Sequence, residues 1–296
     1  DYDAEVLRAV TLLQKEAGLT ADGVIGPKTQ TAFNFSVKQR LRQVELNLER
    51  FRWYPQDFGN RFIYVNIASQ KFYLQENGNK VLTMKVIVGK PDRKTPMLVD
   101  RSSSVVFNPA WVVPPTVFRE DVFPFLKVND LSILNKKRLT IFNDDDQPVD
   151  PNSVNWSKYS ADNVPYYFKQ VAGYSGALGV LKFNLSNPYA IYLHDTGLRS
   201  LFNEEVRYLS SGCVRLEKPV ELATYLLKDK MAEADIRSAL LENDNVPPEK
   251  ESERRVSYNQ SIPVYINYMT ADLDVDGHMV FYNDTYQADA NLHKRW

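Results

Sequence analysis

The spacing of the apolar residues changes near residue 61, and this change limits the folds that the chain can adopt. Before it, apolar residues recur every three or four positions, which is typical of one face of an amphipathic helix. They are Val37, Leu41, Val44, Leu48 and Phe51. After it, residues 62–67 alternate as a strand, and residues 72–75 and 81–88 flank Asn77-Gly78, a pair that accepts positive φ and favours a hairpin. We therefore expect helices before residue 61 and a β-rich domain after it.

Weaker signals predict the remaining elements. Residues 3–35 are expected to form two short helices around a loop, with Pro27 at the first position of the second helix. Residues 116–126 are expected to form a short helix limited by Pro124. Further predictions are strands at about 98–107, 110–113, 178–183 and 189–194, helices at about 219–228 and 232–242, a polar linker at 243–255, and a closing strand pair, 262–268 and 279–282, around a turn at 274–277.

These elements predict an α+β fold, in which a small α-helical module precedes a mainly β domain. The expected segments are 1–36 for the helical module, 37–60 for a helical linker, 61–243 for the main domain and 244–296 for a C-terminal extension with a strand pair. The stretch at about 120–175 is too long for an ordinary connection, so we interpret it as either a functional lid or a mobile insertion. Its aromatic residues argue against plain disorder.

The charge balance excludes some partners. The chain has 36 Lys and Arg residues against 37 Asp and Glu residues, so no overall field favours nucleic acid or an anionic membrane. No apolar run reaches the roughly 18–20 residues that cross a bilayer. The chain begins at Asp1 without a Met or an apolar leader, so either a targeting segment was removed or the chain is a fragment.

Neither a metal nor a cofactor is expected. Asp272-x-Asp274-x-Asp276-Gly277 resembles a calcium loop, but Asn283 stands at the twelfth position where such loops carry Glu, so a hairpin turn is the better interpretation. His278 and His293 have no partners nearby in sequence and are expected at the surface. Four Asn-x-Ser/Thr sequons matter only in a eukaryotic secretory setting. They begin at Asn155, Asn184, Asn259 and Asn283.

The single cysteine, Cys213, is the residue on which the functional interpretation depends. A thiol is a weak nucleophile until it loses its proton, so a catalytic cysteine needs a base or a positive field nearby. His194 ends a predicted strand, and the following loop can return Cys213 beside it. We also expect the helix after Cys213 to aim its N-terminus near the thiol, and Gly212 to let the backbone amides face an oxyanion.

Residues around this pair are candidates for substrate binding. Arg215 is spaced to lie on the same side of an extended chain as Cys213, where it can clamp a carboxylate. Ser210 and Ser211 can add hydroxyl donors. Structural alternatives remain open: a lone cysteine in a β-rich domain is more often a small buried hydrophobic residue, and Arg215 can instead pair with Glu217 or Glu221.

At these residues the chain resembles the YkuD-like L,D-transpeptidase family. The family signature is a His, an intervening stretch and then Ser/Thr-His-Gly-Cys with an apolar residue and Arg or Asn. His194 and Ser210-Ser211-Gly212-Cys213-Val214-Arg215 match it, except that Ser211 replaces the second His. In the family the upstream His is the base and the second His lines the oxyanion hole. The resemblance therefore implies His194 as the base and leaves oxyanion binding to the backbone.

The resemblance extends over most of the chain. The blocks 64–74, 86–90, 95–96 and 108–115 look like the family's opening strand pair, the segment after it and an Asn-Pro-x-Trp stretch near the substrate channel, which contains Trp111. Residues 4–35 look like a peptidoglycan-binding module. The segment near 120–175 and the tail beyond 255 resemble the large YcbB-type enzymes of the Gram-negative periplasm, which carry a substrate-capping insertion. The implied location is therefore the periplasm or cell envelope of a Gram-negative bacterium.

This family implies a cysteine acyltransferase that cross-links peptidoglycan stem peptides. Its partners are these peptides, carbapenem β-lactams as covalent inhibitors and other cell-wall synthesis enzymes. Two alternatives stay open: an L,D-carboxypeptidase that uses water as acceptor, and a non-catalytic peptidoglycan-binding scaffold. The candidate catalytic residues are Cys213, His194, Gly212 and Asp195. The candidate substrate-binding residues are Arg215, Tyr192, Ser211, Ser210 and Trp111.

Overall fold

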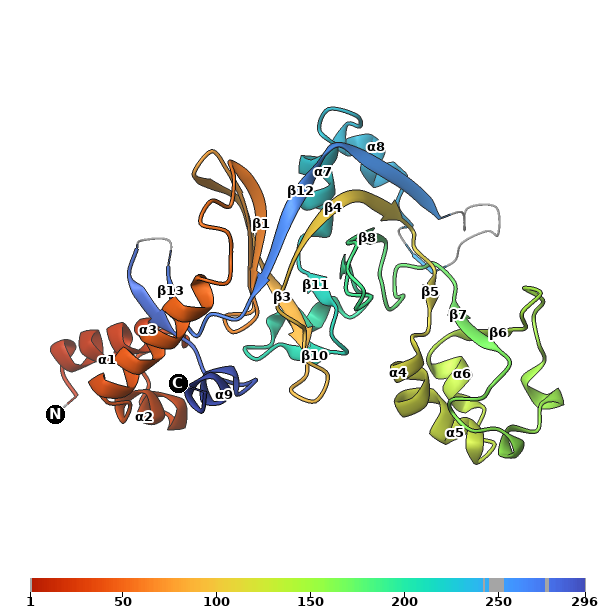
Figure 1. Cartoon of the computed structure of the whole chain (residues 1–296), viewed down its shortest axis with the longest axis horizontal. Helices are drawn as coiled ribbons and strands as arrows, with labels where there is room; N and C mark the ends of the chain where they lie inside the picture. The colour runs from red at the N-terminus through yellow and green to blue at the C-terminus, as the bar shows by residue number, and fades with distance from the viewer. Residues whose placement is uncertain (1, 242, 245–252, 275–276, 296) are drawn as a thin grey trace. The chain divides into compact units, whose positions relative to one another are not determined.

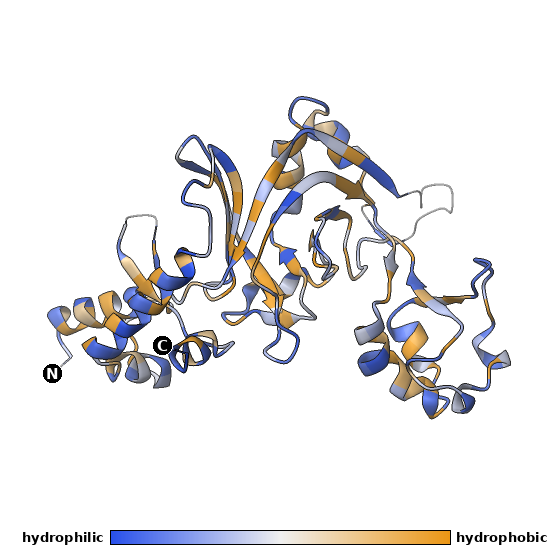
Figure 2. Ribbon diagram, viewed as in Figure 1, coloured by the Kyte–Doolittle hydropathy of each residue, from blue (hydrophilic) through white to orange (hydrophobic). Residues whose placement is uncertain are grey.

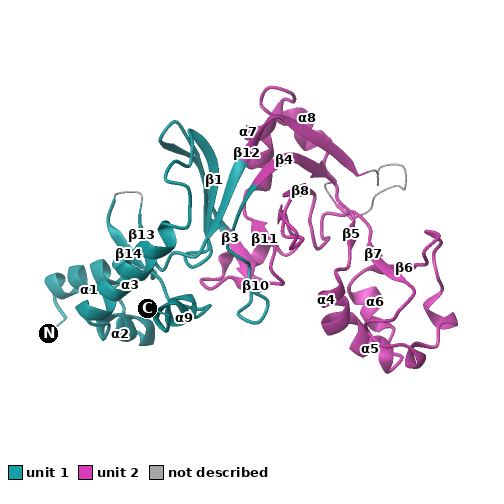
Figure 3. Ribbon diagram, viewed as in Figure 1, with its two compact units in different colours: residues 1–85, 90–100, 263–296 teal, residues 86–89, 101–262 magenta. Residues whose placement is uncertain are grey.

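The computed structural model describes residues 2–241, 243–244, 253–274 and 277–295, and the chain forms two compact units (Figures 1 and 3). Unit 1 comprises residues 1–85, 90–100 and 263–296, and unit 2 comprises residues 86–89 and 101–262. A helical N-terminal segment precedes a mainly β structure, which confirms the predicted fold class. Within the described ranges, no helix has both the length and the apolar character needed to cross a membrane.

Three helices begin unit 1, as predicted. They are α1 (Ala4–Glu16), α2 (Pro27–Phe33) and α3 (Val37–Phe51). The Asp3 side chain caps α1 by accepting hydrogen bonds from its first turn, and Pro27 opens α2. A capping box starts α3, because Ser36 and Gln39 each satisfy a backbone N–H of the other.

A buried glutamine holds the loop between α1 and α2. Gln14 is 2% exposed and donates to Asp22 (2.8 Å), to the Val24 carbonyl (3.0 Å) and to Thr29 (3.1 Å). Its carbonyl oxygen accepts from the Gly23 N–H (2.8 Å). All four bonds lie within the N-terminal helical pair, so this pair is fixed by a polar centre as well as by apolar contacts.

The strands of unit 1 begin with the predicted hairpin. They are β1 (Arg61–Asn66), β2 (Lys71–Glu76) and the first part of β3 (Asn79–Gly89). Asn77 and Gly78 turn the chain at φ values of +50° and +82°, as their sequence predicts. The end of β12 (Arg254–Asn267) runs parallel to β1, with Ile63 opposite Val264.

The C-terminal segment differs from the prediction. The partner of β14 (Met279–Phe281) is β13 (Ala271–Leu273), whereas residues 262–267 belong to β12 and pair with β1. A single long strand occupies the position predicted for one arm of a hairpin, because its apolar residues fit a buried parallel pair. The turn between β13 and β14 lies partly outside the described residues. A further short helix, α9 (Ala288–His293), was not predicted.

Helix α3 packs on this C-terminal segment through side-chain hydrogen bonds. Gln43 donates to the carbonyls of Thr270 (2.8 Å) and Tyr282 (2.9 Å). Asn47 donates to the Thr270 hydroxyl (2.7 Å) and accepts from its N–H (2.8 Å). The predicted division into four segments stays a prediction, but residues 37–51 pack on residues 263–274 and 277–295 within unit 1.

Unit 2 contains the second group of strands and its own helices. The strands are the end of β3, β4 (Leu98–Phe107, from residue 101), β5 (Trp111–Val112), β6 (Leu139–Phe142), β7 (Tyr167–Gln170), β8 (Leu181–Phe183), β9 (Leu193–His194), β10 (Tyr208–Ser210), β11 (Val214–Leu216) and the start of β12. The helices are α4 (Pro115–Val117), α5 (Phe123–Lys127), α6 (Ser132–Lys136), α7 (Pro219–Leu227) and α8 (Glu233–Ser238). The predicted helices at 219–228 and 232–242 are confirmed, although α8 is shorter. Residues 245–252 of the predicted linker lie outside the described part of the chain.

The segment at about 120–175 folds with its own small core. Strands β5, β7 and β6 form a three-stranded sheet, and apolar residues from the adjoining helices pack with Trp156 (1% exposed) and Phe168 (3% exposed). Figure 2 shows orange apolar stretches and blue polar stretches on these short helices. The prediction that Pro124 limits the first helix was wrong. A π-helical turn (Phe118–Val122) continues into α5, where Pro124 occupies the first turn and needs no N–H partner.

Candidate active site

Three strands of unit 2 place a row of ionisable side chains on one face. Lys182 of β8 pairs with His194 of β9, and His194 pairs with Arg215 of β11. Paired residues on neighbouring strands point to the same side, and alternate residues point to opposite sides. The other side is core, because Leu193 and Val214 are fully buried. The strand register alone therefore brings two cations and an imidazole together.

Cys213 lies one residue before β11 and next to this row. Its side chain is half-buried, and the thiol donates a long hydrogen bond to the Ala190 carbonyl (3.7 Å). Burial raises the pKa of the Cys213 thiol, while a hydrogen bond from the Tyr192 backbone and the charges of Arg215 and Lys182 act in the opposite direction. The surroundings therefore oppose the cost of burying a thiolate.

His194 is buried and held in one tautomer. Burial lowers the pKa of its imidazole to about 3, and the charges of Arg215 and Lys182 add to this effect. The ring is therefore neutral at neutral pH. Its Nδ1 bonds to the backbone carbonyl of Asp195. Because a carbonyl only accepts, Nδ1 carries the proton and Nε2 keeps the lone pair of a base.

The Asp195 carboxylate points to other partners. It accepts from the Val180 N–H (3.0 Å) and forms an ion pair with Arg199. Burial raises the pKa of this carboxyl, and these two contacts oppose the rise. Gly179 at φ +57° makes room for it, since a Cβ there would lie 2.2 Å from Asp195 Oδ2. Asp195 thus orients His194 through its main chain, while its side chain fixes the strand end.

The loop from Ser210 to Cys213 is closed by a serine. The Ser210 hydroxyl donates to the Cys213 carbonyl (2.6 Å) and accepts from the Gly212 N–H (3.1 Å). Its proton is therefore used within the loop, which differs from the expectation of a donor to substrate. Gly212 has a φ of +117°, a value that L side chains rarely adopt, so glycine is required for this turn. Ser211, in the position where the family has a second His, is exposed.

One electrostatic expectation was wrong. The helix that follows Cys213 is α7, and it starts only at Pro219, after strand β11. Cys213 is therefore not in the first turn of a helix, where a dipole acts on a thiol. The two cations of the row, Lys182 and Arg215, are the charges that lower the pKa of the thiol instead.

Arg215 has no acidic partner among the residues that the structure describes. Its Nε is buried without a hydrogen bond, and burial lowers the pKa of the guanidinium while the charge of Cys213 opposes this. Among the described residues, Arg215 forms no ion pair with Glu217 or Glu221, which was the structural alternative. A half-buried guanidinium with free donors beside a thiol is suited to a carboxylate ligand.

Lys182 is a residue that the sequence interpretation missed. Its ammonium lies 3.9 Å from the centre of the Tyr192 ring, and burial lowers its pKa while the charge of Cys213 opposes this. Burial and the charge of Cys213 both raise the pKa of Tyr192. The sequence placed Lys182 in a predicted strand next to the strand of His194. Only the register, which no local signal specifies, shows that the two residues are opposite each other.

Trp111 is located at the insertion. It lies in β5 opposite Gln170 of β7 and packs against the core of the segment at about 120–175. Its expected role in the substrate channel remains a prediction. His278 and His293 are exposed, as expected, and neither belongs to the row on β8, β9 and β11.

A family model of the YkuD L,D-transpeptidase catalytic domain matches residues 60–236, which contain the whole row and Cys213. The chain belongs to this family. A putative L,D-transpeptidase of Haemophilus influenzae is 37% identical over 262 residues, covering 85% of this chain and 49% of that protein. The chain thus spans about half the length of this curated relative.

Solved structures also show similarity at low identity. A structure of the L,D-transpeptidase LdtMt1 in complex with imipenem has a TM-score of 0.33 at 14% identity, covering 70% of this chain and 58% of that one. A structure of an L,D-transpeptidase from Xylanimonas cellulosilytica has a TM-score of 0.27 at 13% identity, covering 90% of this chain and 82% of that one.

Proposed function

We propose that the protein cross-links peptidoglycan stem peptides through a thioester on Cys213. The observation that carries this proposal is the row on β8, β9 and β11, which gathers a base with a free Nε2 and two cations beside the single cysteine of a YkuD-family domain. General-base and electrostatic help are what a thiol needs to become a nucleophile.

In the proposed reaction, His194 Nε2 takes the thiol proton, and the sulfur of Cys213 forms a bond to the carbonyl carbon of meso-diaminopimelate, the third residue of a donor tetrapeptide. The bond to the terminal D-Ala breaks, and His194 returns the proton to the leaving amine. The side-chain amine of a second diaminopimelate then attacks the thioester and gives a proton to His194 Nε2, the bond from carbon to sulfur breaks, and the sulfur of Cys213 takes this proton back as a thiol. This completes a 3→3 cross-link without an added co-reactant.

The surrounding residues have supporting roles in this proposal. The backbone N–H of Cys213 stabilises the tetrahedral oxyanion, since the Gly212 N–H already donates to Ser210 and Ser211 stands in the position of the second His. Arg215 binds a substrate carboxylate, which its donors without protein partners favour. The charges of Lys182 and Arg215 favour the thiolate that forms when His194 takes the proton.

Acylation by a carbapenem tests the assignment of the nucleophile. A β-lactam carbonyl traps an activated thiolate, so mass spectrometry should find one covalent adduct on Cys213. The matched control is Cys213→Ala, which leaves the fold intact because the half-buried thiol donates only a 3.7 Å hydrogen bond. An adduct that persists in Cys213→Ala would sink the proposal.

Product analysis separates transfer from hydrolysis. With a purified disaccharide-tetrapeptide as both donor and acceptor, the transpeptidase gives dimers and free D-Ala in equal amounts. An L,D-carboxypeptidase gives tripeptide and D-Ala without dimers. An inert scaffold, the third alternative, gives neither product. Only the appearance of dimers supports the proposed function.

We also propose that the insertion at about 120–175 is a substrate lid and that residues 4–35 bind peptidoglycan in the periplasm, with cell-wall enzymes as partners. Because the insertion has its own apolar core, the whole segment can be deleted as one unit. Deleting it should reduce dimer formation more than carbapenem acylation, and an equal loss would make it merely structural. Cosedimentation of the parent and of a chain lacking residues 1–36 with isolated peptidoglycan tests the second role.

A further inference from the structure

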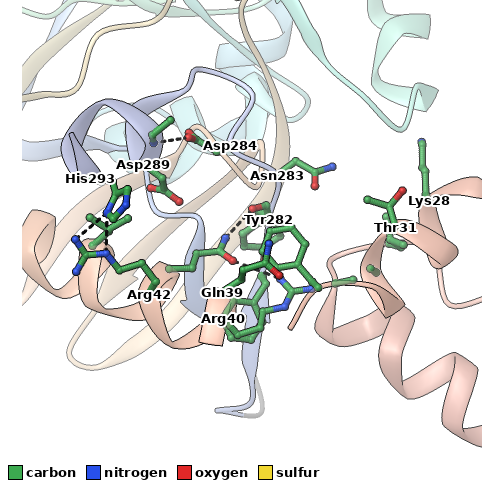
Figure 4. Close-up of a pocket in the computed structure, with 18 residues that line it drawn as sticks. Lys28, Thr31, Gln39, Arg40, Arg42, Tyr282, Asn283, Asp284, Asp289 and His293 are labelled. Carbon is green, nitrogen blue, oxygen red and sulfur yellow. Dashed lines mark hydrogen bonds between the residues drawn. The ribbon is translucent and has the colours of Figure 1, made fainter. Parts of the chain in front are cut away.

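Unit 1 contains a cavity of about 650 Å3 that the proposed reaction does not use. Its walls come from α2, from α3 and from the segment that runs from β14 to α9 (Figure 4). Leu19, Ala32 and Leu46 form part of its apolar lining. Cavities that bind small ligands are of this size and combine apolar walls with a few polar groups.

The carboxylates at the cavity are already occupied. Asp284 accepts from the N–H groups of Ala288 (2.7 Å) and Ala290 (3.1 Å) and from the Tyr268 hydroxyl (3.0 Å). Asp289 forms an ion pair with the buried Arg50 and accepts from the Thr270 hydroxyl. Both carboxylates are thus held by these partners, and among the described residues neither forms an ion pair with Arg40.

Arg40 is the cation that lacks such a partner. The Cζ atom of its guanidinium lies 4.6 Å from the centre of the Phe35 ring and 4.4 Å from the centre of the Phe281 ring, and one long hydrogen bond joins it to Gln43 (3.4 Å). Over the described residues it forms no ion pair. Burial lowers its pKa while the charge of Glu16 opposes this, and an arginine stays charged in either case. With two rings close by and one long hydrogen bond to the protein, most of its N–H donors remain for a ligand.

A second donor lies on α9, which forms another wall of the cavity. The Nδ1 of His293 accepts from Arg42 Nε (3.0 Å), so the proton of the neutral ring is on Nε2. Figure 4 shows Arg42 reaching His293, with Arg40 beside Tyr282, and Lys28 and Thr31 on the neighbouring helix. Arg40 and the His293 ring thus supply donors at this cavity, whereas the carboxylates of Asp284 and Asp289 already accept hydrogen bonds from the protein.

We propose that this cavity binds the free carboxylate of a short peptide. The carboxylate lies on the edge of the Arg40 guanidinium, and a small apolar side chain of the peptide lies against Ala32 and Leu46. A planar guanidinium held by two rings matches a carboxylate with two parallel hydrogen bonds. The volume admits a few residues of peptide. The carboxylate has two possible sources, a peptidoglycan stem peptide ending in D-Ala or an unrelated peptide C-terminus, and only the first rests on the proposed function.

Calorimetry with the full chain, its Cys213 alkylated to block the catalytic site, tests the inference. The probes are the stem tetrapeptide that ends in D-Ala, the same peptide as its C-terminal amide, and an acetylated L-Ala-L-Ala. We expect the free acid to bind at least tenfold more tightly than the amide. We expect Arg40→Gln to remove this difference in affinity. Arg40→Lys keeps the positive charge but not the two parallel N–H donors, so we expect it to reduce the difference.

Two results would overturn the inference: equal affinity for acid and amide in the parent, or a preference for the acid that persists in Arg40→Gln. Tighter binding of the D-Ala peptide than of acetylated L-Ala-L-Ala identifies the stem peptide, and equal binding identifies any C-terminal carboxylate. Melting curves of Arg40→Lys control for folding. Carbapenem acylation in Arg40→Gln should equal that of the parent. The inference about the cavity can therefore fail while the proposed function holds, and the reverse.

Discussion

Arg215 in unit 2 and Arg40 in unit 1 are both half-buried arginines without an acidic partner among the described residues, yet their surroundings differ. Arg215 shares a strand face with a thiol whose pKa its charge lowers. Arg40 lies close to two aromatic rings and lines a cavity. The charge of Arg215 lowers the pKa of a thiol of the protein itself. Arg40 has no such thiol beside it, which is why we assign it a ligand.

The two sites also differ in how the chain builds them. Strand pairing between neighbouring segments forms the site of Arg215, and its residues lie between 182 and 215. The site of Arg40 joins residues near the start of the chain to residues near its end, such as Phe281. A variant can therefore damage one site and leave the other intact, and the following predictions use this separation.

The largest effect is expected for His194→Ala. Removing the base should slow alkylation of Cys213 near neutrality and dimer formation by about 10²–10⁴-fold, the usual contribution of a general base. The rate of iodoacetamide labelling at pH 7 measures the first effect. The cavity of unit 1 should keep its preference for the free acid. Equal labelling rates in parent and variant would remove His194 from the role of base.

A comparably large effect on stability, confined to unit 1, is expected for Arg50→Met. Arg50 is 1% exposed and pairs with Asp289, so its removal leaves a largely buried carboxylate alone and should cost about 3–5 kcal/mol at neutral pH. Hydrogen exchange of the α3 amides measures this loss. Arg52→Met, which removes a 78%-exposed side chain from a surface pair, is the control and should change little. A Cys213 labelling rate that falls with Arg50→Met would contradict the separation.

The sequence predicted much of the first site and little of the second. His194, Gly212, Cys213 and Arg215 carry signals that lie within one stretch of chain, namely a strand end, a required glycine and a lone thiol. The helices and the hairpin were predictable for the same reason, because periodicity and turn residues are local. Lys182 was missed because strand register is set by tertiary packing.

The cavity was not predictable because it depends on a distant contact. Gln43 bonds to carbonyls more than 220 positions later in the chain, and no pattern near residue 43 indicates this. The C-terminal strand pairing was mispredicted for the same reason, because β12 pairs in parallel with the distant strand β1 and not with residues 279–282. The spacing of the apolar residues in α3 predicted a helix. It did not predict which segment of the chain this helix packs against.

A moderate effect is expected for Lys182→Met. Without this cation the pKa of Cys213 rises further, so less thiolate is present and alkylation at pH 7 should fall by about an order of magnitude. Lys182→Arg should restore most of the rate. The control is Lys228→Met, because the ammonium of Lys228 lies over the Tyr225 ring instead. A labelling profile against pH that does not move in Lys182→Met would show that Lys182 only packs on Tyr192.

The smallest effect concerns stability against pH. His194 titrates near 6.5 when the chain is unfolded and at about 3 when folded, so the unfolded state binds the extra proton between these values. Stability therefore falls as the pH decreases through this window, by about 1 kcal/mol between pH 7 and pH 5.5. The buried Asp195 has a raised pKa and acts in the opposite direction, so the parent must be compared with His194→Gln, which keeps Asp195. Urea unfolding of both proteins at the two pH values isolates the histidine. If the two proteins lose equal stability, the imidazole of His194 is solvated in the folded protein rather than buried between the strands that carry Lys182 and Arg215.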